Sequence, residues 1–229
     1  MTAIDHASSN QPQPELPPIT TPKATVFVKA LSKRARKRLM VHFLALDERD
    51  RLLRFGSPLS DDLVQRYVES LDFSRDTIFG VYDRALRLLG VGHLAFASRA
   101  TLPALQAVTS KEKIAEYGVS VSSAACGMGV GTRLFERAAI HCRNADIDTL
   151  YMHCLSSNKV MMHIAKKAGM TIHRDHGEAD AYLKLPPANP ASVIQEAMQE
   201  QVASLDYTVK ANVRAALKWL RSLRGANKN

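Results

Sequence analysis

Long apolar runs are missing from this sequence. No stretch approaches the roughly 20 consecutive apolar residues that a membrane-spanning helix needs, and residues 1–22 lack the basic start and apolar core of a signal peptide. Cysteine is also scarce. Cys126, Cys142 and Cys154 are an odd number without metal-ligand spacing, which indicates a reduced chain and not a disulfide scaffold. These absences predict a soluble, cytoplasmic protein without a membrane partner.

Acidic residues are in the minority, with 22 Asp and Glu against 31 Lys and Arg, for a net charge of +9. The excess favours acidic partners, such as a phosphate-bearing ligand, nucleic acid or an acidic protein surface, without choosing among them. Six basic residues gather between Lys29 and Arg38, but no aromatic residues alternate with them as base stacking would require. We interpret this cluster as the solvated face of a first helix, and we do not expect nucleic acid as a partner.

The composition is ordinary for a soluble globular protein, at 46% hydrophobic and 23% charged residues. Residues 1–22 are rich in Pro, Gln, Ser and Thr, which predicts a disordered tail. Residues 23–187 form the predicted domain, and the prolines between Pro186 and Pro190 mark its end. Residues 188–229 are predicted to form a linker and a C-terminal amphipathic helix.

Apolar residues recur at helical spacing between Ala191 and Leu223. Such a stripe must be buried somewhere. Two outcomes are open, docking on the chain's own core or pairing with another subunit in a homodimer; a membrane-surface role for the basic end is not expected. The stripe consists of Ile194, Met198, Val202, Leu205, Val209, Val213, Leu217, Leu220 and Leu223.

The most informative segment runs from Ile114 to Arg133. Tyr117–Val121 has the β-formers and small residues of a buried strand, and apolar residues recur at helical spacing from Thr132 onward. Between them, Gly127, Gly129 and Gly131 remove Cβ atoms where the backbone must turn sharply. Because the first amides of a helix lack internal partners, this order predicts a site where backbone N–H groups hold a phosphate.

Two familiar phosphate loops do not fit these residues. A Walker loop needs a lysine in a spacing that this segment lacks. A dinucleotide fingerprint would place its third glycine at Thr132 or Leu134. The pattern that remains is Gly-x-Gly-x-Gly-Thr-x-Leu.

With its surroundings, the segment resembles the GNAT superfamily of acyl-CoA-dependent N-acyltransferases, and most closely the bacterial protein-lysine acetyltransferase type. The family's Q/R-x-x-G-x-G/A signature falls on Cys126–Gly131, after an AE-type strand at Ala115–Glu116. Its N-x-x-A-x-x-L-Y-x-K-x-G-F helix is similar to Asn158–Met170. Cys126 departs from the leading Gln or Arg, and Ala165 departs from the tyrosine that often serves as general acid. The resemblance covers roughly residues 24–185.

This resemblance implies an α/β (α+β) fold, with a mixed, mostly antiparallel central sheet flanked by helices and an extra C-terminal helix. The sequence pattern adds helices over Asp47–Phe55 and Ser60–Leu71, the second capped by Ser60, and a hairpin from Thr77–Tyr82 and Leu86–Ala97. A further strand is predicted over Thr149–Leu155.

The resemblance also implies acetyl-CoA as co-substrate and acetyl transfer to an amine, a protein lysine first and a small amine second. Asn158 would contact the pantetheine arm or order the strands, although it also fits an ordinary helix cap. The acyl-CoA would lie along Val119 and Val121, with its pyrophosphate on the amides of Gly127, Met128, Gly129, Val130, Gly131 and Thr132. The competing interpretation is a catalytically silent acyl-CoA-binding sensor.

Glu116 is the candidate catalytic residue. An amine near its reference pKa of about 10.4 is mostly protonated at neutral pH, so a group must remove its proton before it attacks a thioester. Relatives of the protein-lysine type place a glutamate ten residues before the Q/R position, and Glu116 stands ten before Cys126. The alternative is a surface glutamate paired with Lys111 or Lys113.

The departure at Ala165 leaves the general acid open. CoA leaves as a thiolate whose thiol has a reference pKa of about 8.5, so protonation helps without being indispensable. Tyr151, His153 or His163 can replace the tyrosine, and their spacing does not choose among them.

Three further candidates have plainer interpretations. His93 fits a core histidine better than a proton shuttle beside Glu116, and Cys126 fits a small replacement better than a redox or covalent residue. His173 and His176 are too few ligands for a metal site, so no metal is predicted.

Overall fold

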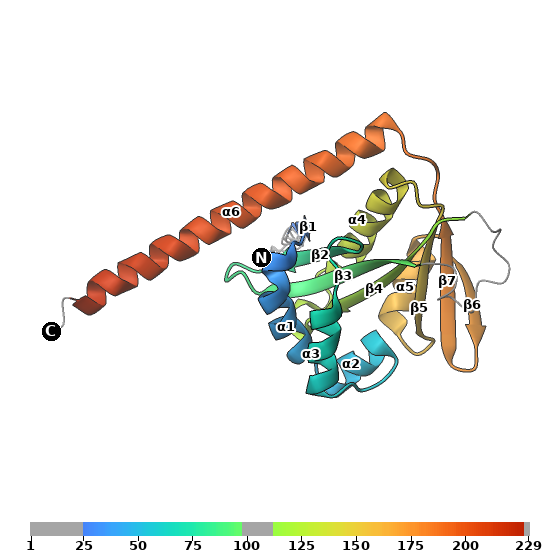
Figure 1. Ribbon diagram of the computed structural model, residues 1–229, viewed down its shortest axis with the longest axis horizontal. Coiled ribbons are helices and arrows are strands. Elements are labelled where there is room, and N and C mark those ends of the chain that lie inside the picture. The colour runs from blue at the N-terminus through green and yellow to red at the C-terminus, as the bar shows by residue number, and fades with distance from the viewer. Residues whose placement is uncertain (1–24, 98–111, 227–229) are drawn as a thin grey trace, which may run out of the picture.

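The computed structural model describes residues 25–97 and 112–226. Their centre is one seven-stranded sheet with the order β1-β2-β3-β4-β5-β7-β6 (Figure 1). All neighbours are antiparallel except β4 and β5, which run parallel. This is the mixed, mostly antiparallel sheet that the sequence predicted. The strands are β1 Lys29–Ala30, β2 Thr77–Tyr82, β3 Leu88–Ala97, β4 Ile114–Val121, β5 Thr149–Leu155, β6 Thr171–Asp175 and β7 Glu178–Lys184.

Helices cover both faces of the sheet (Figure 1). One face carries the short 3-10 helix η1 (Lys33–Ala35), α1 (Arg36–Leu44), α2 (Glu48–Phe55) and α3 (Asp61–Ser70). The opposite face carries α4 (Val130–Asn144) and α5 (Lys159–Lys167). The 3-10 helix η3 (Ser123–Ala125) connects β4 to the loop before α4.

The alternation of side chains along the strands divides the core into two layers. Ile78 and Val91 face α1 and α3, where they pack with Phe43, Val64 and Val68. The other layer joins the sheet to α4 and α5, and it contains Phe79, Leu94, Tyr117, Leu134 and Met162. Because Tyr117 lies on the α4 side, its neighbours Glu116 and Gly118 belong to the α1–α3 side.

Helix ends follow local sequence, with one exception. The Asp47 carboxylate accepts a hydrogen bond from the Asp50 amide (2.7 Å) at the start of α2, and Gly56 ends that helix in the left-handed region. Ser60 does precede α3, but its side chain makes no capping hydrogen bond, so that detail of the prediction was wrong. The helix begins there because Asp61 and Asp62 place negative charge in its first turn.

The C-terminal helix α6 (Pro190–Ala226) is the longest element, and it projects well past the sheet (Figure 1). Its first part packs on α4 and β1. The predicted tail, residues 1–22, lies outside the described residues. Across residues 25–97 and 112–226, no helix has the length and apolarity that a membrane crossing requires.

Candidate functional site

The parallel pair at the centre of the sheet separates partway along. Ile114, Ala115 and Glu116 pair with Thr149, Leu150 and Tyr151, and there the pairing ends. From this point β4 continues along β3, while β5 continues along β7. The strands therefore open into a V with Glu116 at the last paired position.

A cavity of about 420 Å³ lies at this opening, which we call the splay cavity. Helix α2 contacts both β4 and β5, and its C-terminal end lines the cavity. The rest of the lining comes from the middle of β4, the end of β5, the start of β7 and one residue of α5. The lining residues are Leu53, Arg54, Phe55, Gly56, Ser57, Glu116, Tyr117, Gly118, Val119, His153, Cys154, Leu155, Met161 and Glu178.

Glu116 is half-buried and lines the splay cavity. Lys113, one of the two lysines considered as its partner, pairs instead with Asp146 (2.6 Å), and Lys111 lies outside the described residues. Within the described ranges, no lysine, arginine or histidine nitrogen comes within 4.0 Å of the Glu116 carboxylate. The carboxylate thus faces the cavity without a cationic partner.

The glycine loop leads from the end of β4 into α4. Gly127 (φ 76°) and Gly129 (φ 78°) are left-handed, a conformation that residues with a Cβ adopt at a cost, and Gly129 is the N-cap of α4. A Cβ added at Gly127 or Gly129 would meet no atom within 4 Å, so the space beside both residues is open. At Gly131 a Cβ would lie 3.3 Å from Ile164 Cδ1, a close approach to α5.

Several amides of this loop have no acceptor in the described part of the chain. They belong to Gly127, Gly129, Val130, Gly131 and Thr132, whereas Met128 donates to the Ala125 carbonyl (3.3 Å). Unpaired amides at the positive end of a helix, beside open space, suit a pyrophosphate. The loop therefore fits the phosphate part of an acyl-CoA, with Met128 as a poorer donor than its neighbours.

Val119, Val121 and Asn158 lie at three different places around the cavity and the glycine loop. Val119 lines the cavity, and Val121 packs near Gly131. Asn158 is buried, and its Oδ1 accepts from the Met161 amide (3.1 Å) as the cap of α5. Its Nδ2 donates to the Leu53 carbonyl (3.4 Å), so this side chain joins the start of α5 to the end of α2.

Arg54 is a cavity residue that sequence reasoning missed. Its guanidinium lies directly over Gly118, where a Cβ would come within 2.6 Å of the guanidinium carbon. Nη2 donates to the Tyr67 hydroxyl (2.9 Å), and the guanidinium stacks on the Phe55 and Tyr67 rings. A glycine in the middle of a strand often marks a close approach, so Gly118 was the available signal.

A hydrogen-bonded chain continues from Arg54 behind the cavity. His93 Nε2 donates to Asp76 (3.0 Å), which leaves Nδ1 to accept from the Tyr67 hydroxyl (3.1 Å). Burial lowers the pKa of His93 although Asp76 opposes this, and burial raises the pKa of Tyr67 although Arg54 opposes it. His93 is thus a neutral, satisfied histidine that touches Tyr67, in agreement with the plainer interpretation.

The residues considered for the role of general acid differ in how deeply they are buried. Ala165 is fully buried in the core. His153 lines the cavity, and its Nδ1 donates to the Asp180 carboxylate (2.9 Å), which also accepts from the Tyr151 hydroxyl (2.6 Å). Burial is the main cause that raises the pKa of Tyr151. His163 is exposed on α5.

The remaining candidates lie away from the cavity. Cys126 is exposed, and its thiol contacts the Ser122 carbonyl. His173 and His176 lie on and after β6, and the described residues contain no group of three or more His, Cys, Asp and Glu side chains placed to hold a metal.

The basic cluster of Lys29–Arg38 has a mixed role. Lys33, Arg34 and Lys37 are exposed, as the solvated-face interpretation predicted. Arg36 instead donates to the Glu69 (2.8 Å) and Leu71 (2.9 Å) carbonyls at the end of α3. That part of the interpretation was wrong, because long basic side chains also pack their stems.

Comparison with known proteins finds one family model that matches the part of the chain containing the cavity and the glycine loop. The Acetyltransferase (GNAT) family matches residues 55–170, just over half of the chain. No curated protein sequence matches.

Solved structures share the fold at low identity. The GNAT domain of S. lividans PAT superposes with a TM-score of 0.58 at 21% identity, over 70% of this chain and 90% of that one. Spermidine N-acetyltransferase from Vibrio cholerae, solved with CoA and spermine, gives 0.51 at 17% identity, over 69% and 95%. An acetyltransferase from Salmonella typhimurium, solved with acetyl-CoA, gives 0.51 at 11% identity, over 72% and 97%.

Proposed function

The chain belongs to the GNAT family of acetyltransferases, which use acetyl-CoA, and on this premise we propose that it transfers the acetyl group to an amine by direct attack, with Glu116 as general base. One observation carries the proposal. Glu116 lies where β4 and β5 separate, lines the splay cavity and has no cationic partner among the described residues. A carboxylate so placed can accept a proton from an ammonium group that enters the cavity.

Acetyl-CoA would supply the thioester, and this chain's residues would bind and orient it. The amides of Gly127, Gly129, Gly131 and Thr132 would hold the pyrophosphate, and Val119 and Val121 would border the pantetheine arm. An N–H group of β4 near Val119 would donate to the thioester oxygen as negative charge develops there. Asn158 would hold the end of α2 in place beside the opening between β4 and β5, through its hydrogen bond to the Leu53 carbonyl.

Two side chains account for the protons. Glu116 takes one proton from the acceptor ammonium, and the amine nitrogen then bonds to the acetyl carbon. As the carbon–sulfur bond breaks, the nitrogen loses its second proton, and the departing CoA thiolate takes up one. His153 is the one of the three earlier candidates that lines the cavity. Its Nδ1 donates to Asp180, so its Nε2, 3.8 Å from the Glu178 carboxylate, can accept the second proton of the nitrogen and pass it to the thiolate.

The acceptor is an amine, and both a protein lysine and a small amine enter the proposal. The relative from Vibrio cholerae is named for spermidine, and the cavity at the end of α2 supports an acceptor that approaches from the α1–α3 side. A cytoplasmic location accords with three unpaired cysteines.

Glu116→Gln tests the proposal against the sensor alternative. We expect turnover of acetyl-CoA with an amine panel to fall at least about 100-fold, since general bases contribute about that much or more, while calorimetric affinity for acetyl-CoA stays unchanged. Glu48→Gln is the control, because Glu48 is exposed on α2, does not line the cavity and should retain the activity. The sensor interpretation would be supported if the wild type bound acetyl-CoA without turnover and Glu116→Gln changed neither the affinity nor the turnover.

A further inference from the structure

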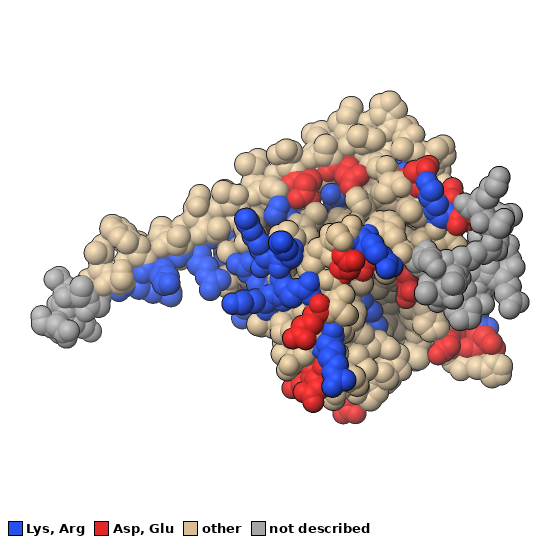
Figure 2. Space-filling model, viewed as in Figure 1, with Lys and Arg blue, Asp and Glu red and all other residues tan. Residues whose placement is uncertain are grey.

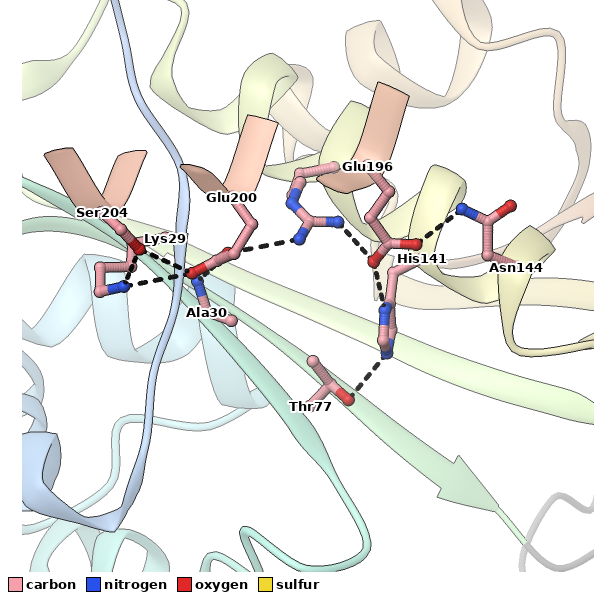
Figure 3. A network of polar contacts seen from close by, with 9 residues as sticks. Lys29, Ala30, Thr77, His141, Asn144, Glu196, Glu200 and Ser204 are labelled. Carbon is pink, nitrogen blue, oxygen red and sulfur yellow. Dashed lines mark hydrogen bonds and ion pairs between the residues drawn. The ribbon is translucent and has the colours of Figure 1, made fainter. Parts of the chain in front are cut away.

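Helix α6 is attached to the domain through its polar face (Figure 3). Glu196 accepts hydrogen bonds from Arg137 (2.7 Å), His141 (2.7 Å) and Asn144 (2.6 Å) on α4. One turn later, Glu200 binds Lys29 (3.1 Å) and the Ala30 amide (3.1 Å) on β1. The inward face of α6 is therefore built from ion pairs and hydrogen bonds.

The apolar stripe points the other way. Ile194, Met198, Leu205 and Val209 are each 60% exposed or more, whereas Ala203 on the inward face is 2% exposed. The stripe does not dock on the chain's own core, so that alternative was wrong. Figure 2 shows the outer edge of the projecting helix free of charged side chains, with lysines and arginines along its inner side.

The spacing of the stripe is regular. Its steps are 4, 4 and 3 residues, repeated from Ile194 to Leu220 with Ala216 in the pattern. An 11-residue repeat keeps one face of a nearly straight helix aligned with a partner helix, in contrast to the seven-residue repeat of a left-handed coiled coil. The face is about 40 Å long at 1.5 Å per residue.

The projecting end has few contacts with the domain. Within the described residues, Arg214 makes the last hydrogen bond from α6 to the domain, to the Ala85 carbonyl. Beyond it, Leu217, Trp219, Leu220 and Leu223 are all about half exposed or more. Because short isolated helices are marginal in water, this end needs an apolar partner.

We propose that the stripe binds the same stripe of a second copy of this chain, with the two α6 helices antiparallel. Support from the domain decides the direction. A parallel pair would place the two projecting ends together, away from both domains. An antiparallel pair instead places each projecting end, with Leu217 and Leu220, against the half of the other helix that is held on its own domain through Glu196 and Glu200.

The stripe is self-complementary in this direction. Centred near Tyr207, an antiparallel pair sets Ile194 against Leu220, Met198 against Ala216 and Leu205 against Val209 of the second copy. Large residues then meet small or β-branched ones along the length. The domains lie on opposite outer sides, since each helix keeps its polar face on its own domain.

Sedimentation equilibrium of the full chain tests the pairing. We expect the wild type to be a dimer at micromolar concentration, and Leu205→Glu or Val209→Glu to weaken it at least 100-fold with unchanged circular dichroism. Ala215→Glu is the control, because Ala215 lies on the same helix but off the stripe, and it should remain dimeric. A monomeric wild type that sediments instead with anionic phospholipid vesicles would overturn the proposal, as would a monomer that binds neither.

The direction has a separate test. A spin label at Ser222→Cys, in a Cys126→Ser background that removes the exposed thiol, should give a label–label distance of about 45 Å in an antiparallel dimer. A distance of about 15 Å would show parallel helices and contradict the antiparallel pairing.

A second inference has an independent basis in Arg54 and rests on the proposed function. Glu116 and Gly118 share one face of β4, about 7 Å apart along the strand, and the Arg54 guanidinium lies on Gly118. In the described part of the chain, no carboxylate oxygen comes within 4.0 Å of this guanidinium. The cavity wall thus presents a carboxylate and an unpaired guanidinium side by side.

The geometry points to an acceptor that carries a carboxylate close to its amino group, as an amino acid does. Glu116 would receive the ammonium group, and Arg54 would receive the carboxylate through a charge-assisted hydrogen bond. An acceptor with a positive charge alone would gain nothing from Arg54 and would be repelled by it.

Kinetics with a panel of free amino acids and their carboxamides tests this assignment. We expect the acids to be preferred, and Arg54→Gln to raise their KM at least tenfold, with less effect on kcat and on acetyl-CoA affinity. Arg49→Gln, an exposed arginine of the same helix, is the control. Equal use of acids and carboxamides, or a preference for lysine peptides, would overturn this inference alone, whereas no turnover with any amine would contradict the proposed function itself.

Discussion

Glu116 lies opposite Tyr151 in the parallel register of β4 and β5, and this pair is the last before the strands separate. Beyond it, β4 has no strand on its β5 side, so its backbone groups are open to a ligand. The same position sets Glu116 at the edge of the splay cavity. A single change in pairing thus supplies both a free strand edge and a carboxylate beside it.

Asn158 should act on both helix α5 and the cavity mouth. Asn158→Ala removes the cap of α5 and the bond to Leu53, so we expect a loss of about 1 kcal/mol in unfolding free energy and severalfold weaker acetyl-CoA binding. Asn158→Asp keeps the capping oxygen and loses the donor, so it should retain most of the stability and still bind more weakly. Urea unfolding and calorimetry separate the two effects. Equal stability of all three proteins would contradict the capping role.

His42 should make folding stability depend on pH. Its Nδ1 donates to the Leu88 carbonyl (3.1 Å) and Nε2 accepts from Ser120 (2.8 Å), and burial lowers its pKa to about 4. As pH falls from about 6.5, the unfolded chain binds a proton that the folded chain refuses, so the folded state loses stability until pH about 4.

The size of this effect follows from the two pKa values. Between pH 7.5 and pH 5, the wild type should lose about 2 kcal/mol more than His42→Gln does. Urea unfolding at both pH values measures the difference. The exposed His176→Gln should follow the wild type, and a His42→Gln variant with the same pH dependence as the wild type would rule out a neutral buried histidine.

Glu196 should hold α6 on the domain down to low pH. Burial opposes its ionisation, but hydrogen bonds from His141, Arg137 and Asn144 outweigh burial and lower its pKa to about 2. The stability from this group is therefore present above pH about 4.5 and is lost as pH falls toward 2.

Glu196→Gln tests that attachment directly. We expect hydrogen exchange in residues 190–206 to accelerate about tenfold, as the loss of charged hydrogen bonds worth about 1.5 kcal/mol predicts. Exchange in β5 and β7 should stay unchanged. Gln195→Glu, an exposed neighbour, provides the control. Equal exchange in both variants would show that the apolar contacts of Ala203 are sufficient for docking.

Local sequence was enough to predict the glycine loop. Gly127 and Gly129 adopt the left-handed conformations that glycine allows, and α4 follows them with its apolar face inward. These features depend on neighbours along the chain, and so do the cap at Asn158 and most of the strands. Tyr117–Val121 and the AE-type strand at Ala115–Glu116 both fall within β4, which begins one residue earlier, at Ile114.

Contacts between distant segments were beyond the sequence. Arg54 reaches Gly118 across 64 positions, and only the folded sheet brings them together. The periodicity of α6 identified its apolar face but not its direction, since Glu196 and Arg137, 59 residues apart, decide which face turns inward. An ion pair between residues far apart in the chain produces no periodic pattern in the sequence.

Calorimetric titration with acetyl-CoA tests acyl-CoA binding at the glycine loop, using the wild type, Gly129→Val and Gly131→Val. Gly169→Ala is the control, because Gly169 is also left-handed (φ 71°) but ends α5 away from the loop. We expect micromolar binding by the wild type and the control, and at least tenfold weaker binding by folded loop variants. Undetectable binding by the wild type, or equal affinity in all four proteins, would contradict a phosphate cradle at Gly127–Thr132.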